Sequence, residues 1–197
     1  MTFRLGLTGS IGMGKSTTAK LFAEEGCAVW DADAAVHRLY SRGGAAVDPI
    51  AEAFPDTVAE GAVDRARLRR IIAEDPEALK RIEAIVHPLV AEDRAGFIAA
   101  QDAEVTVLDI PLLYETGCPD AFDAVAVVTV APAVQRARVL ARGTMSEAEF
   151  ETILARQVPD ADKRARADYV IETDTMDHAR AQVRAILAKI RKGLTDA

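Results

Sequence analysis

Apolar residues in this chain gather in short runs, and longer amphipathic segments lie between these runs. Five runs are apolar almost throughout, and they span residues 3–8, 27–30, 105–110, 124–130 and 169–172. A strand with one solvent-facing side alternates apolar and polar residues, whereas a strand covered on both faces does not. The five runs therefore predict the strands of a buried parallel sheet.

Segments with helical spacing lie between and after these runs. Residues 15–25 place apolar side chains three and four positions apart, and Gly26 follows them as a typical helix-ending residue. Residues 176–192 form a second amphipathic pattern, whose simplest role is to cover the sheet. Strands that alternate with helices along the chain predict an α/β protein with an open parallel sheet flanked by helices.

Two connections are too long to be simple crossovers between strands. Residues 34–102 are helical in pattern and rich in charge, and we interpret them as a helical insertion. Residues 133–167 carry seven basic residues, and we interpret them as a helical lid. The basic residues of this segment are Arg136, Arg138, Arg142, Arg156, Lys163, Arg164 and Arg166. The core of a single domain then consists of residues 1–33, 103–132 and 168–197.

Composition and charge narrow the expected partners. The chain has 197 residues, of which 50% are hydrophobic, and its 24 Lys and Arg against 31 Asp and Glu give a net charge of −7. We do not expect nucleic-acid binding as the main function of such an acidic chain. No apolar run reaches the roughly 18 residues of a membrane-spanning helix, and the N-terminus lacks a signal-peptide pattern. We therefore expect a cytoplasmic protein without a membrane partner, whose oligomeric state is open.

The two cysteines give the same indication about compartment. Cys27 and Cys118 are far apart and do not form a Cys-x-x-Cys motif. We expect both to be reduced and to act as small apolar packing residues of a cytosolic protein.

The most specific motif directly follows the first predicted strand. Residues 8–17 read TGSIGMGKST and match Gly-x-x-x-x-Gly-Lys-Ser, the pattern of a nucleotide-binding phosphate loop (P-loop). Its glycines let backbone N–H groups turn inward around a phosphate, and the helix that begins near Lys15 directs its positive end to the same place. Lys15 can reach the β- and γ-phosphates, and the Ser16 hydroxyl is suited to Mg²⁺. The predicted site for ATP and Mg²⁺ comprises Gly12, Met13, Gly14, Lys15, Ser16 and Thr17.

Acidic residues follow two other strands. Asp31 and Asp33 alternate with Ala32, so an extended strand end would place both carboxylates on one face. One could orient or deprotonate an attacking hydroxyl, and the other could hold Mg²⁺-bound water. We favour Asp33 as the base because it lies further beyond the carboxyl edge of the sheet, although either residue could instead cap the next helix. Asp109 could hold metal-bound water or make a structural hydrogen bond.

A phosphate loop alone is compatible with several classes of protein. A GTPase switch would need an Asn/Thr-Lys-x-Asp motif and an Asp-x-x-Gly motif after the third strand, and residues 109–115 read DIPLLYE instead. A small-molecule phosphotransferase of the shikimate-kinase or nucleotide-monophosphate-kinase type is an alternative. Shikimate kinases also place Asp-x-Asp after the second strand, but they have a glycine cluster after the third strand and a shorter acceptor subdomain.

Further motifs, taken in order, resemble the dephospho-CoA kinase family over nearly the whole chain. They are TGSIGMGKST at 8–17, DAD at 31–33, GAVDRARL at 61–68, VHP at 86–88, PLLYE at 111–115, RGTMS at 142–146, RQ at 156–157 and ADYVI at 167–171. Ser10 stands where the family usually has glycine. A variable loop position tolerates a small hydroxyl residue if its φ is negative.

This resemblance implies transfer of the ATP γ-phosphoryl group to the ribose 3′-hydroxyl of dephospho-CoA, which gives CoA and ADP in the last step of coenzyme A biosynthesis. It implies a P-loop kinase fold whose insertion binds the acceptor. Lys15, Asp33 and Arg142 are the catalytic candidates. Arg142 is the lid arginine we favour, because a planar guanidinium can bind two phosphate oxygens at once.

The expected acceptor contacts are Asp31, Asp33, Arg65 and His87. For Arg65, a salt bridge to Asp64 or Glu60 is the alternative role. His87 precedes Pro88, a position that predicts a turn or a helix break, and packing is its alternative role.

Overall fold

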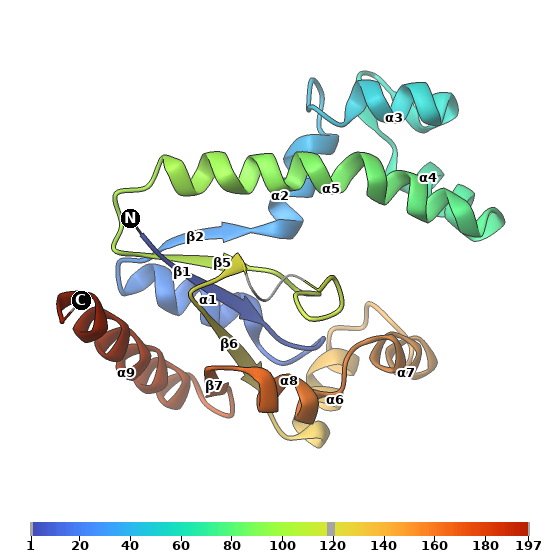
Figure 1. Ribbon diagram of the computed structural model, residues 1–197. Helices are drawn as coiled ribbons and strands as arrows, with labels where there is room; N and C mark the ends of the chain where they lie inside the picture. The colour runs from blue at the N-terminus through green and yellow to red at the C-terminus, as the bar shows by residue number, and fades with distance from the viewer. Residues whose placement is uncertain (1, 118–120, 197) are drawn as a thin grey trace. The chain divides into compact units, whose positions relative to one another are not determined.

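The structure is a computed structural model that describes residues 2–117 and 121–196 (Figure 1). Contacts divide the chain into two compact units. The first unit contains Met1–Trp30 and Gln101–Ala197, and the second contains Asp31–Ala100.

Of the two cysteines, Cys118 lies outside the described residues, whereas Cys27 is a buried free thiol. Burial raises the pKa of this thiol to about 11.

A five-stranded sheet forms the centre of the first unit in the described part of the chain. Its strands have the order β2-β5-β1-β6-β7, and they span Phe3–Thr8 (β1), Ala28–Asp31 (β2), Val105–Asp109 (β5), Ala124–Thr129 (β6) and Tyr169–Glu172 (β7). Leu5 of β1 pairs in parallel register with Val107 of β5 and with Ala124 of β6. The predicted parallel sheet is confirmed, and each strand lies within one residue of its expected bounds.

Two helices cover one face of this sheet. Helix α1 spans Lys15–Glu24 and helix α9 spans Met176–Thr195, and the two helices pack against each other (Figure 1). Their buried side chains form one apolar cluster with Leu5 and Leu7 of β1. Gly26 follows α1 with a φ of 88°, the left-handed conformation in which glycine commonly ends a helix.

Apolar residues after β5 cover the opposite face. A Cβ atom on Gly6, which points away from the α1 side, would lie 2.9 Å from Leu113 and 3.2 Å from Phe122. Both of these side chains are buried. The sheet therefore has apolar contacts on both faces, which explains why its strands are apolar throughout.

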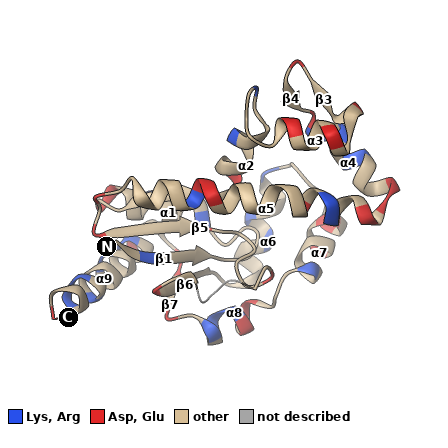
Figure 2. Ribbon diagram, turned by 45° about the horizontal axis from the view of Figure 1, so that its top comes forward, with Lys and Arg blue, Asp and Glu red and all other residues tan. Residues whose placement is uncertain are grey.

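Three helices occupy the segment between β6 and β7 that we call the lid. They are α6 (Pro132–Ala141), α7 (Glu147–Arg156) and α8 (Asp160–Arg166). Ser146 begins α7 through a reciprocal capping box with Glu149. Acidic and basic side chains lie next to one another along α8 (Figure 2).

The second unit is mainly helical and has its own apolar core. Its helices are α2 (Ala32–Tyr40), α3 (Val47–Ala53), α4 (Arg65–Glu74) and α5 (Pro76–Ala99), with a short 3₁₀ helix at Pro55–Thr57. Leu39, Ile50 and Leu68 belong to one buried cluster with Ile82 and Val86 of α5. Each of the four helices thus contributes to the same core.

A small hairpin in this unit was not predicted. Strands β3 (Val58–Ala59) and β4 (Ala62–Val63) pair antiparallel around Glu60 and Gly61. Both turn residues have positive φ, 52° and 76°, as a two-residue hairpin turn of type I′ requires. Strands of two residues are too short to produce an apolar run in the sequence.

The prediction of a turn or helix break at His87 is wrong. Helix α5 runs for 24 residues and contains Pro88 in its interior. A proline inside a helix costs about 3 kcal/mol, because it has no N–H for the carbonyl one turn earlier. Burial of Ile82 and Val86 against the other helices offsets this cost, since each buried side chain contributes about 1.5–3 kcal/mol.

Among residues 2–117 and 121–196, no helix combines the length and the apolarity that a membrane crossing requires.

Candidate active site

The phosphate loop connects β1 to α1 and depends on two glycines. Gly12 and Gly14 have φ values of 78° and 90°, in the left-handed region that favours glycine. Gly14 is also the N-cap of α1, and no side chain of the described residues caps that helix. The N–H groups of its first turn are therefore available to an anion.

Neighbouring strands hold the centre of the loop. The Thr173 hydroxyl, just after β7, donates to the Met13 carbonyl at 2.7 Å. The Met13 sulfur accepts the N–H of Val130 at 3.2 Å, and the Met13 side chain is buried. The Met13 N–H donates to the Ser10 carbonyl at 3.2 Å. A contact of Met13 with a nucleotide would have to use this same N–H, and it stays a prediction.

Lys15 begins α1 and forms an ion pair with Asp109. Asp109 ends β5, and only 1% of its side chain is exposed, against 14% for Lys15. The carboxylate therefore holds the ammonium group at the start of the helix. Two roles were expected for Asp109, namely a structural bond and the binding of metal-bound water. The ion pair with Lys15 corresponds to the structural role.

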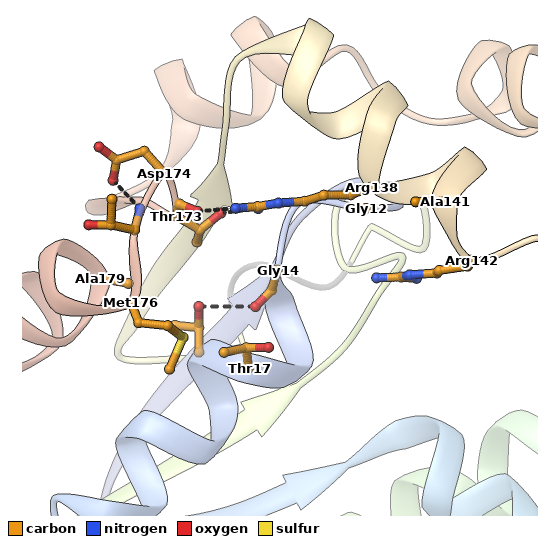
Figure 3. A pocket seen from close by; sticks show the side chains of 12 residues that line it. Gly12, Gly14, Thr17, Arg138, Ala141, Arg142, Thr173, Asp174, Met176 and Ala179 are labelled. Carbon is orange, nitrogen blue, oxygen red and sulfur yellow. Dashed lines mark hydrogen bonds between the residues drawn. The ribbon is translucent and has the colours of Figure 1, made fainter.

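A pocket of about 480 Å³ lies beside the loop (Figure 3). Its lining comes from the loop and the start of α1, the end of α6, and the connection from β7 to α9. The lining residues are Gly12, Gly14, Thr17, Thr18, Arg138, Ala141, Arg142, Thr173, Asp174, Thr175, Met176 and Ala179. The structure thus brings four predicted site residues together, namely Gly12, Gly14, Thr17 and Arg142.

Two lid arginines line this pocket in different ways. Arg138 donates to the Thr173 hydroxyl at 3.1 Å and to the Thr173 carbonyl at 2.6 Å. The Arg142 side chain is exposed, forms no hydrogen bond or ion pair with any described residue, and extends from the end of α6 toward Gly14 (Figure 3). Arg136 is held by Glu147 and Glu151. Of the two lid arginines that line this pocket, Arg142 is therefore the one whose guanidinium group has no protein partner among the described residues.

Asp31 and Asp33 do not share the face of an extended strand, so this part of the prediction is wrong. Asp31 ends β2 and is the N-cap of α2, where its carboxylate accepts the N–H of Ala34 at 2.8 Å. The helix begins at Ala32 because this cap satisfies one of its open N–H groups. Asp33 is exposed in the first helical turn, where a negative charge also interacts favourably with the helix dipole.

Arg65 and His87 are exposed on helices of the second unit. Arg65 is the first residue of α4 and pairs with no acidic group among the described residues, so the alternative salt bridge is absent. Asp64 instead pairs with Arg67 at 3.2 Å. Hydrogen bonds from two backbone N–H groups lower the pKa of the Asp64 carboxyl, and the one from Arg67 has a larger effect than the one from Ala66. Roles for Arg65 and His87 toward an acceptor stay predictions.

A buried ion pair that joins the lid to Glu115 was not predicted. Lys163 of α8 is fully buried and lies 2.8 Å from the carboxylate of Glu115. Glu115 also accepts the N–H of Val158 at 2.9 Å. Burial by itself would raise the pKa of Glu115, but the nearby Lys163 ammonium group and the N–H of Val158 outweigh it and lower that pKa. Lys163 lies in a run of charged residues that is typical of an exposed helix, so no sequence signal indicated its burial.

The glycine-rich loop between the first strand of a parallel sheet and a helix, with a lysine at the helix start, defines a P-loop nucleotide-binding protein. Comparisons with known proteins give the family. The family model for dephospho-CoA kinase matches residues 3–178. The chain belongs to the dephospho-CoA kinase family.

Individual relatives agree with this assignment. A Ruegeria pomeroyi protein named dephospho-CoA kinase is 67% identical over 193 residues, which cover 98% of each chain. The crystal structure of TT1252 from Thermus thermophilus superimposes with a TM-score of 0.85 at 33% identity, covering 95% of this chain and 97% of the other. The dephospho-CoA kinase of Campylobacter jejuni, at 22% identity and a TM-score of 0.72, covers 98% and 99% and shows the shared fold.

The buried ion pair leads to a stability prediction. Glu115→Gln removes the negative partner of a fully buried ammonium group and should lower the free energy of unfolding by about 3–5 kcal/mol. Because the folded-state pKa of Glu115 is lowered, its contribution is complete above the unfolded pKa of about 4.3 and is lost as the pH falls through the folded-state value. Urea unfolding at pH 7 and below pH 4 measures both effects.

Glu104→Gln is the matched control, since Glu104 forms an exposed pair with Arg191 at 3.4 Å. It should change stability by less than about 1 kcal/mol. Equal stabilities of the two variants at pH 7 would contradict the importance of the buried pair.

Proposed function

We propose that this enzyme transfers the γ-phosphoryl group of ATP to the ribose 3′-hydroxyl of dephospho-CoA and releases ADP and CoA. Membership of the dephospho-CoA kinase family carries the proposal, together with the relative of that name at 67% identity. The phosphate loop supplies the donor half of the site. The cytoplasmic location expected from the sequence stays a prediction.

The donor nucleotide would bind at the loop and the adjoining pocket. Its phosphates would accept hydrogen bonds from backbone N–H groups of residues 12–17, while Lys15 would contact the β- and γ-phosphates. The pocket volume of about 480 Å³ is within the range of small-molecule sites and can take the nucleoside. The exposed side chain of Met176 offers an apolar surface for the base.

Mg²⁺ fits this site through the hydroxyl of Ser16. Ser16 is exposed in the first turn of α1, directly after Lys15. No group of three or more His, Cys, Asp or Glu in the described ranges could hold a metal, so the other ligands would be phosphate oxygens and water, as is usual for Mg²⁺ in kinases. The ion supplies positive charge that offsets the charge of the phosphates.

Side chains of this protein would provide the rest of the chemistry. Asp33 would orient and deprotonate the attacking hydroxyl, since ligands of open parallel sheets bind beyond the carboxyl ends of the strands and Asp33 follows β2. Arg142 would contact the transferring phosphate, and closure of the lid would exclude water. Asp31, Arg65 and His87 are the proposed acceptor contacts.

An ADP-release assay with dephospho-CoA, shikimate and AMP as acceptors tests the proposed substrate. We expect kcat/KM for dephospho-CoA to exceed that for the other two by at least about 10²-fold, because the groups that recognise it would stay unpaired with smaller acceptors. Lys15→Ala serves as the control for contaminating kinases and should lose at least ~10²-fold in kcat. Turnover with shikimate or AMP, and none with dephospho-CoA, would favour the alternative phosphotransferase.

The role of Asp33 has its own test. Asp33→Asn keeps the size of the side chain but cannot accept the proton, so kcat should fall at least ~10²-fold. Asp48, another exposed acid in the first turn of a helix, provides the matched control. Asp48→Asn should leave kcat within about twofold of the wild-type value, as expected for a surface substitution. Near-normal turnover by Asp33→Asn would mean that another group acts as the base.

A further inference from the structure

Two glutamine side chains hold both backbone groups of one residue in the phosphate loop. The N–H of Ile11 donates to the side-chain oxygen of Gln157 at 3.2 Å. The carbonyl of Ile11 accepts the side-chain N–H of Gln135 at 2.7 Å. Gln135 belongs to α6 and Gln157 directly follows α7, so two elements of the lid contact the residue before Gly12.

The two glutamine side chains supply the backbone hydrogen bonds that Ile11 would have if it were still part of the sheet. Strand β1 ends at Thr8, and α1 begins at Lys15, so Ile11 lies outside regular structure. Buried or partly buried backbone groups need partners, and a glutamine amide can supply either a donor or an acceptor. Ile11 is not among the residues proposed to bind the donor phosphates, so its backbone can serve as an attachment point without competing with ATP.

Gln157 is itself held by the residues around it. The next residue, Val158, donates its N–H to Glu115 at 2.9 Å. The same carboxylate oxygen pairs with the fully buried Lys163 at 2.8 Å. The PLLYE motif, which ends at Glu115, is thereby connected to the Arg-Gln motif, and the Arg-Gln motif to the loop. Neither motif contributes a side chain to the phosphoryl transfer proposed above.

Gln135 is held by packing. Its side chain is buried, with an exposed fraction of 3%. Helix α6 lies directly against the loop, because a Cβ atom on Gly12 would come within 3.2 Å of the Gln135 carbonyl oxygen and 2.5 Å of Val139. A buried amide on a helix in direct contact with the loop has little freedom to leave Ile11.

We propose that Gln135 and Gln157 are positioning residues for phosphoryl transfer. By fixing both peptide groups of Ile11, they direct the N–H groups of the following glycine-rich turn toward the donor phosphates before ATP binds. Neither glutamine touches the reacting atoms, and both act through the backbone of the loop. The effect on turnover rests on the proposed function, whereas the effect on ATP affinity does not.

Methionine substitutions test this role, because methionine keeps the length of glutamine and removes its hydrogen bonds. Gln135→Met and Gln157→Met should each lower kcat about tenfold at saturating ATP and raise the Kd for ATP about tenfold. Gln182 provides the matched control, since its amide also pairs with both backbone groups of one residue, Glu172, at 3.0 and 2.8 Å. Gln182→Met should lower the Tm by a similar amount but leave kcat and Kd within about twofold.

Glutamate substitutions separate positioning from packing. Gln157 acts as an acceptor, so Gln157→Glu keeps the bond to Ile11 and should retain more of the wild-type kcat than Gln157→Met. Gln135 acts as a donor, so Gln135→Glu places a carboxylate against a carbonyl and should be worse than Gln135→Met. A purely structural role predicts no such opposite response.

Wild-type kcat and Kd in both methionine variants, with a Tm loss equal to that of Gln182→Met, would overturn the proposal. So would glutamate variants that respond in the same direction at both positions. If the wild-type enzyme does not phosphorylate dephospho-CoA, the proposed function fails, and the Kd values for ATP alone then support or reject the positioning role.

Discussion

Every part of the first unit depends on how the chain passes from β1 into α1. It must leave a buried strand and enter a helix within a few residues while its N–H groups stay available to an anion. Left-handed backbone at Gly12 and Gly14 makes this path possible, and the cost is a loop with little stability of its own. Thr173 after β7, Val130 after β6 and the two lid glutamines supply the bonds that the loop lacks.

The basic side chains of the lid differ in whether they already have a partner in the protein. Most of its basic side chains are already engaged in contacts with other residues. Arg136 and Arg164 pair with acidic groups, Lys163 is buried on Glu115, and Arg138 is bound to Thr173. Arg142, by contrast, extends into the pocket beside Gly14 (Figure 3). Arg156 is also exposed and forms no side-chain hydrogen bond or ion pair with a described residue, but it does not line the pocket. Arg142 is therefore the lid cation that lies in the pocket with its charge free to bind a phosphate, as catalysis by positioning requires.

Features that depend on neighbours in the sequence could be predicted, and features that depend on distant contacts could not. The strands were predictable because burial on both faces removes polar residues from each run, and the loop because each of its positions has a local chemical reason. Asp33 was placed on a strand because the helical segment was expected to begin at residue 34, whereas Asp31 caps a helix that already begins at Ala32. Pro88 suggested a break at His87, but the burial of Ile82 and Val86 keeps α5 continuous. The contact between Glu115 and Lys163 joins segments far apart in the chain, and neither residue type indicates it.

A crystal structure with a non-hydrolysable ATP analogue and Mg²⁺ tests most directly whether the loop is a preformed donor site. We expect the analogue's phosphates on the N–H groups of residues 12–17 with Lys15 within hydrogen-bond distance of them. The bonds from Ile11 to Gln135 and Gln157 should be unchanged. An analogue bound away from the loop, or a loop that has broken both bonds and refolded around the phosphates, would show that the donor site is not preformed.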